Sequence, residues 1–157
     1  MSRRSEKISV FISFVFIFLL FFAFCFALFW LPDVVTSMID TKDNFGNRGE
    51  ITTLGRRLVL ADAYTIIAVA FVALALLFYL LRVVQKGQVF SSVTVSLLSG
   101  ISWCCFVEGI LSLLLVVYFQ LAFGVAVAAG FLGLCLRIVR HVIEEATRLK
   151  DENEYTI

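Results

Sequence analysis

The chain has too little charge to cover a globular surface. Asp, Glu, Lys and Arg make up 16% of its 157 residues, against about 25% in soluble domains. Hydrophobic residues make up 61%, and phenylalanine alone occurs 17 times. A chain this short and apolar cannot hide its apolar surface from water, which excludes a soluble globular domain. The lack of polar residues also excludes a disordered tail protein.

The residues that carry most protein chemistry are also scarce. A net charge of +1 gives no basic surface for nucleic acid. His141 is the only histidine, with no cysteine or second histidine at ligand spacing, so we expect no metal site. Cysteines 25, 104, 105 and 135 form no Cys-x-x-Cys pair, and we interpret them as small packing residues. Because the common hydrolase, metalloprotease and phosphate-loop motifs are missing too, we expect no cofactor and no enzymatic activity.

Four long hydrophobic stretches dominate the sequence. The first has 24 uncharged residues, enough to cross a hydrocarbon core of about 30 Å at 1.5 Å per residue. Trp30 suits its membrane interface, and Pro32 is expected to end the helix. Because lipid leaves backbone groups to pair within their own segment, each stretch should be a helix. The sequence therefore predicts an all-α integral membrane protein with a single domain, an antiparallel four-transmembrane-helix bundle with a cytoplasmic helical tail. The expected spans are at about 8–31, 58–81, 93–119 and 121–139, the outer loop at 33–57 and the tail at 140–157.

The distribution of Lys and Arg predicts the orientation. With the N-terminus inside, nine basic residues flank the spans on the inner side and four lie on the outer side. Basic residues favour the cytoplasmic side. We therefore expect a multi-pass protein of the cell membrane with both termini in the cytoplasm.

Small residues should mark the helix contacts, because they let two backbones approach closely in lipid. The third and fourth stretches are expected to pack as a hairpin. The same surface on the fourth stretch could instead join two copies of the chain. The candidate packing residues are Ser96, Gly100, Cys104 and Ser112 on one i,i+4 ridge, and Gly124, Gly130 and Gly133 on the fourth stretch.

Glu108 is the most informative polar residue, because it lies near the middle of the third stretch. An acid at the bilayer centre costs at least about 2.5–3.5 kcal/mol on insertion scales, so it should be paired, hydrated or protonated. One interpretation is a proton- or cation-handling site. The other is a protonated glutamate that hydrogen-bonds to Ser, Thr or Tyr on a neighbouring helix.

Asp62 lies near the outer end of the second stretch. It could pair with Arg57 or stabilise the positive end of the helix dipole. Alternatively, Tyr64 and Thr65 could complete an outward-facing polar pocket around it.

The charged tail is a candidate docking surface. Its opposite charges recur at i,i+4 spacing, which favours a helix that leaves the membrane. The expected pairs are Arg140 with Glu144, His141 with Glu145, Glu144 with Arg148 and Arg148 with Glu152. This pattern is typical of a solvated face, but the tail could also bind a cytoplasmic protein together with the link at 86–92. The candidate docking residues are Arg137, Arg140, His141 and Arg148.

Two short motifs resemble the bacterial domain-of-unknown-function family 2975. Lys-Gly-Gln-Val-Phe at 86–90 is similar to the family's Lys-Gly-Asn-Pro-Phe link, with Val89 in place of proline. The ending at 149–157 is similar to its Leu-Lys-Glu-Glu-Asn-Asp-Leu-Thr-Ile close, with Tyr155 in place of leucine. The resemblance covers the chain from about Gly55 onward. It implies a small bacterial inner-membrane protein without established activity, often encoded beside a small helix-turn-helix regulator, and it supplies no catalytic residues.

Two hypotheses for the function follow. The first is a non-enzymatic membrane protein that binds a partner, such as a cytoplasmic regulator, without contacting nucleic acid itself. The second is a small transporter or channel subunit with Glu108 as the coupling group.

Overall fold

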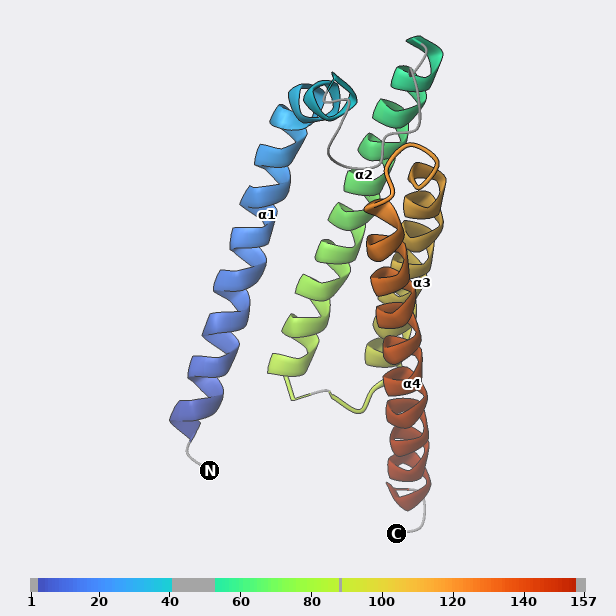
Figure 1. The fold of residues 1–157 in the computed structure, drawn as a ribbon. Coiled ribbons are helices and arrows are strands. Elements are labelled where there is room, and N and C mark those ends of the chain that lie inside the picture. The colour runs from blue at the N-terminus through green and yellow to red at the C-terminus, as the bar shows by residue number, and fades with distance from the viewer. Residues whose placement is uncertain (1–2, 41–52, 88, 155–157) are drawn as a thin grey trace.

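The computed structural model describes residues 3–40, 53–87 and 89–154, and the ordered elements among them are four helices. These are α1 (Arg3–Asp40), α2 (Thr53–Gln85), α3 (Ser92–Leu115) and α4 (Ala122–Glu154). Each is long and apolar enough to cross a membrane, which confirms the expected all-helical class with four candidate spans. Consecutive helices run in alternating directions, so both termini lie at the same end (Figure 1).

The helices form a row rather than a closed bundle. Contacts join α1 to α2, α2 to α3 and α3 to α4, and the last of these interfaces is the most extensive. Across the described ranges, no contact joins α1 to α3 or α4, or α2 to α4. Helix α1 therefore forms one edge of the row, in contact with α2 alone (Figure 1).

The path of α1 differs from the sequence expectation at Pro32. The helix does not end there but continues to Asp40, and its last turns lie across the axis of the preceding part (Figure 1). Proline removes one backbone hydrogen bond and bends a helix without always ending it. Thr36 Oγ1 donates to the Pro32 and Asp33 carbonyl oxygens at 2.9 Å, a pattern that also bends helices. The expected loop at 33–57 is thus helical at 33–40 and at 53–57, and its centre lies outside the described residues.

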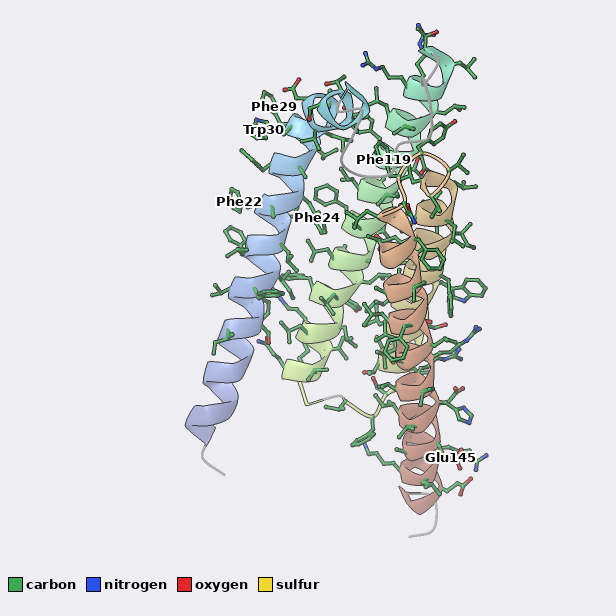
Figure 2. The ribbon with its side chains drawn as sticks, viewed as in Figure 1. Phe22, Phe24, Phe29, Trp30, Phe119 and Glu145 are labelled. Carbon is green, nitrogen blue, oxygen red and sulfur yellow. The ribbon has the colours of Figure 1, made fainter. Side chains whose placement is uncertain are left out.

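Aromatic side chains make the contact between α1 and α2. Phe21 and Phe24 on α1 both pack against Phe71 on α2, with ring centroids 5.6 and 5.9 Å apart. Figure 2 shows Phe24 on the side of α1 that faces α2 and Phe22 on the opposite side. Most other side chains of α1 are exposed, as expected for a helix whose remaining faces meet lipid.

Small residues bring α3 and α4 together. A Cβ atom added at Gly109 would lie 3.4 Å from the Ala126 carbonyl oxygen and 3.6 Å from the Gly130 nitrogen. Ser102 is buried, and its Oγ donates to the Gly133 carbonyl oxygen at 2.9 Å. Backbones this close require residues without bulky side chains. The expected hairpin between the third and fourth spans is therefore present.

The expected packing residues divide among several environments. Gly100 faces α2 instead of α4, because an added Cβ would lie 3.1 Å from Leu76 Cδ1. Ser96 and Gly124 are exposed, and no atom lies within 4 Å of a Cβ built on Gly124 or Gly130. The other five of the seven candidates are at least partly buried: Gly100, Cys104, Ser112, Gly130 and Gly133.

The link and the turn between spans also differ from the expected boundaries. Ser91 caps α3, where its Oγ accepts a hydrogen bond from the Thr94 nitrogen at 3.3 Å. Helix α3 ends at Leu115, four residues before the predicted end of that span, and residues 116–121 turn the chain into α4. Span and tail then form one continuous helix, α4, from Ala122 to Glu154.

Candidate functional site

Asp62 lines an open pocket between α2 and the end of α3 with the turn that follows it. The pocket has a volume of about 490 Å³ and an almost entirely apolar wall. Thr65 lines it as expected, but its Oγ1 donates to the Ala61 carbonyl oxygen at 2.8 Å rather than to the carboxylate. Tyr64 is 42% exposed and is not part of the lining. Tyr118 takes its place, a residue that sequence spacing could not connect with Asp62 because it lies on another segment.

The two structural roles expected for Asp62 are not found. No ion pair joins its carboxylate to Arg57, and Oδ2 is buried without a hydrogen-bond partner among the described residues. The helix dipole stabilises a negative charge only within the first turn of a helix. Because α2 begins at Thr53, Asp62 lies beyond that turn. Asp62 therefore lies at an apolar surface with neither an ion pair to Arg57, nor a hydrogen bond to Oδ2 from a described residue, nor the helix dipole to stabilise its charge.

Glu108 lies on the most buried face of α3. Ile101 precedes it by seven residues and Ser112 follows it by four, and these neighbours on the same face are only 7% and 3% exposed. Glu108 itself is half-buried. Its carboxyl group makes no hydrogen bond or ion pair with any residue that the structure describes, so the expected bond to Ser, Thr or Tyr on a neighbouring helix is not present.

Three of the four candidate docking residues surround one hollow on α4. Arg137, Arg140 and His141 line it together with Glu144, and its volume is about 310 Å³. Arg140 Nη2 lies 3.6 Å from Glu144 Oε2. The fourth candidate, Arg148, lies two turns further along the helix.

The tail of α4 carries ion pairs along its exposed surface. Arg148 Nη2 lies 2.6 Å from Glu145 Oε1, and Arg148 Nε lies 3.7 Å from Glu152 Oε1. The expected i,i+4 pairing of Arg148 with Glu152 is thus found, whereas Glu145 pairs with Arg148 rather than with His141. Glu145 lies near the far end of α4, beyond the ends of α2 and α3 (Figure 2). Exposed pairs of this kind each add only about 0.3–0.5 kcal/mol, so they support the helix without determining its position.

The same tail carries an apolar face that was not predicted from the sequence. Ile138, Val142 and Leu149 are 66%, 63% and 51% exposed. Their spacing of four and seven residues places them on one side of α4. We call Val142 and Leu149 the tail strip, because Ile138 belongs to the predicted membrane span. The sequence does contain the pattern that predicts this face, because Val142 and Leu149 are apolar residues spaced seven apart within a charged segment.

Potential metal ligands do not gather in the part of the chain that the structure describes. Nowhere in residues 3–40, 53–87 and 89–154 do three His, Cys, Asp or Glu side chains come together as potential ligands. The four cysteines there carry free thiols.

The four helices indicate a multi-pass membrane protein. The model of the family described as "Protein of unknown function (DUF2975)" matches residues 3–157. The chain belongs to this family, which confirms the resemblance and extends it over essentially the whole sequence, including the first 54 residues. No curated protein and no solved structure matches the chain.

Proposed function

We propose that this chain is a non-enzymatic protein of the bacterial inner membrane that binds a cytoplasmic protein through the tail of α4. Both termini then lie in the cytoplasm, in line with the nine-to-four distribution of basic residues. The helices cross the membrane as an antiparallel set, and α4 carries its charged end into the cytoplasm.

The exposed tail strip is the observation that carries this proposal. Val142 and Leu149 leave apolar side chains on a helix that extends past α2 and α3 (Figure 1). Arg148 and its two carboxylate partners stabilise the helix beside the strip. A helix with apolar residues at i and i+7, flanked by charges, is the form that lies in the groove of a partner protein. A small regulatory protein with such a groove is the partner we propose.

Affinity purification from native membranes tests the proposal. We expect the full chain to recover one protein in fixed stoichiometry, and a version ending at Val139 to recover none. The double variant Val142→Ser and Leu149→Ser should also lose the partner. The matched control, Val142→Leu with Leu149→Met, keeps the strip apolar and should retain it.

Several outcomes would overturn the proposal. Equal recovery of the partner by the full and shortened chains would place the binding site elsewhere. Recovery of the tagged chain with an untagged copy of itself would assign the strip to self-association. A C-terminal alkaline phosphatase fusion that is active, and therefore outside the cytoplasm, would contradict the orientation.

The unpaired state of Glu108 favours a second candidate, a small transporter or channel subunit. A carboxyl group on the buried face of α3, without a partner among the described side chains, could carry a proton or cation. Its test is pH-dependent uptake of ions into liposomes that contain the purified chain. Uptake should disappear in Glu108→Gln and persist in Asp62→Asn. Without uptake in the unchanged chain, this candidate is wrong.

A further inference from the structure

The hollow on α4 has the features of an anion site. Arg137, Arg140, His141 and Glu144 line about 310 Å³ of open space, and Arg140 is ion-paired with Glu144 at 3.6 Å. With His141 neutral, the lining has a net charge of +1. That charge complements a single monoanionic group such as a phosphodiester.

Contacts with α3 hold both arginines in position. The Arg137 guanidinium carbon lies 5.5 Å from the centre of the Trp103 ring and 5.8 Å from the Phe106 ring, within the range of cation–π attraction. Arg140 Nη1 donates to Ser99 Oγ at 3.4 Å. Both side chains are thus oriented before any ligand binds, which lowers the entropic cost of binding.

Hydrogen-bond donors of these arginines are still unused. Arg140 Nε is buried and has no partner among the described residues. Arg137 contacts two ring faces and donates no hydrogen bond to a described group. Because Arg140 Nε is enclosed by the protein, an acceptor in the open hollow would be bound by the terminal guanidinium nitrogens of Arg137 and Arg140. Phosphate oxygens match the planar fork of donors that arginine presents.

The depth of the hollow points to lipid. Residues 122–136 are uncharged, and fifteen helical residues span about 22 Å at 1.5 Å per residue. The uncharged turn at 116–121 adds to this length, and long arginine side chains extend toward the interface, so the guanidinium groups of Arg137 and Arg140 lie toward the edge of a hydrocarbon core about 30 Å thick. Lipid phosphates occupy this level, and basic pockets between membrane helices bind anionic headgroups.

We propose that Arg137 and Arg140 bind the phosphate of an anionic phospholipid in the leaflet on the side of the chain termini. The acyl chains lie against exposed apolar residues of α4 such as Leu134 and Ile138. Glu144 limits the site to one negative charge and thereby favours a phosphodiester over a doubly charged phosphomonoester. This site does not depend on the proposed protein partner, because the tail strip takes no part in the hollow.

The test compares two short-chain phospholipids with the full chain in an uncharged detergent. Binding of phosphatidylglycerol and of phosphatidylcholine is followed by native mass spectrometry and by the emission of Trp103 in a Trp30→Phe background, because Trp30 is the second tryptophan of the chain. We expect clear preference for phosphatidylglycerol. Arg140→Gln should weaken that binding by about fivefold, the change that one basic residue near anionic lipid produces. Arg148→Gln removes the same charge outside the hollow and should leave the preference unchanged.

Two further measurements keep the proposal falsifiable if Arg140→Gln folds poorly. Glu144→Gln raises the charge of the hollow and should strengthen phosphatidylglycerol binding. Inorganic phosphate at millimolar concentration should not compete, since it lacks acyl chains. Equal binding of the two lipids, an equal loss in Arg148→Gln, or full competition by inorganic phosphate would each overturn the assignment to lipid.

Discussion

The close approach of α3 and α4 at Gly109 gives the sharpest test of the fold. We expect Gly109→Leu to destabilise the pair of helices. A Cβ atom at this position would lie 3.4 Å from the Ala126 carbonyl oxygen and 3.6 Å from the Gly130 nitrogen. Both neighbours belong to the backbone of α4 and cannot rotate away. The outer atoms of leucine therefore fit only if the helices move apart.

The expected magnitude follows from overpacking. Inserting side-chain atoms into a well-packed contact costs about 1–3 kcal/mol, which lowers the ratio of folded to unfolded protein about 5- to 150-fold. Gly124→Leu is the matched control, because no atom lies within 4 Å of its added Cβ and the site is exposed. The two variants share the gain in helix propensity of about 0.8 kcal/mol over glycine. The difference in stability between the two variants therefore reports the α3–α4 contact at Gly109 alone.

Reversible unfolding in mixed micelles measures the difference. Helix content is followed by far-ultraviolet circular dichroism. The α3–α4 contact is followed by the emission of Trp103, whose ring contacts Arg137 across it, in chains that carry Trp30→Phe. We expect Gly109→Leu to unfold at a lower fraction of denaturing detergent than Gly124→Leu. If the two variants unfold together, the helices do not approach closely at Gly109 and the reasoning is refuted.

Three further predictions concern other parts of the chain. Ser102→Ala should lower stability by about 0.6 kcal/mol, the average for a hydrogen bond between membrane helices, in the same micelle assay; no change would mean that the bond to the Gly133 carbonyl oxygen is not formed. Pro32→Ala should straighten α1 and lengthen the distance between spin labels at positions 22 and 37, and an unchanged distance would assign the bend to Thr36 instead. Asp62→Asn should raise stability by on the order of 1 kcal/mol at neutral pH, because an unpaired buried charge is removed; a loss of stability would show that the carboxylate has a stabilising partner.

The helices themselves were predictable because length and composition determine them. In the run from Ile8 to Leu31, 24 residues carry no charge, so lipid leaves a helix as the default for the backbone. The tail was predictable for a different reason. The i,i+4 spacing of Arg140 with Glu144 and of Arg148 with Glu152 allows ion pairs only on a helix.

The helix ends were harder to predict, because composition alone does not locate them. Pro32 was expected to end the first helix, yet a single proline removes one hydrogen bond and the following residues continue the helix to Asp40. The start of α2 at Thr53 has a consequence for the candidate site. It moves Asp62 away from the helix end and removes the dipole that was expected to stabilise its charge.

The faces of the helices could be predicted only in part, because lipid does not impose the pattern that water does. In water, an amphipathic pattern selects the buried face, whereas in lipid the apolar side chains of α1 and α2 are equally suited to every side. Side-chain size then selects the contacts. Gly100 admits Leu76 of α2, and Gly109, which sequence analysis passed over, admits the backbone of α4. An i,i+4 ridge of small residues shows that α3 can approach a neighbouring helix closely. Which helix each ridge residue contacts depends on the three-dimensional path of the chain. Glu108 lies between these two contact directions on the helix surface, on the same face as the buried side chains of Ile101 and Ser112.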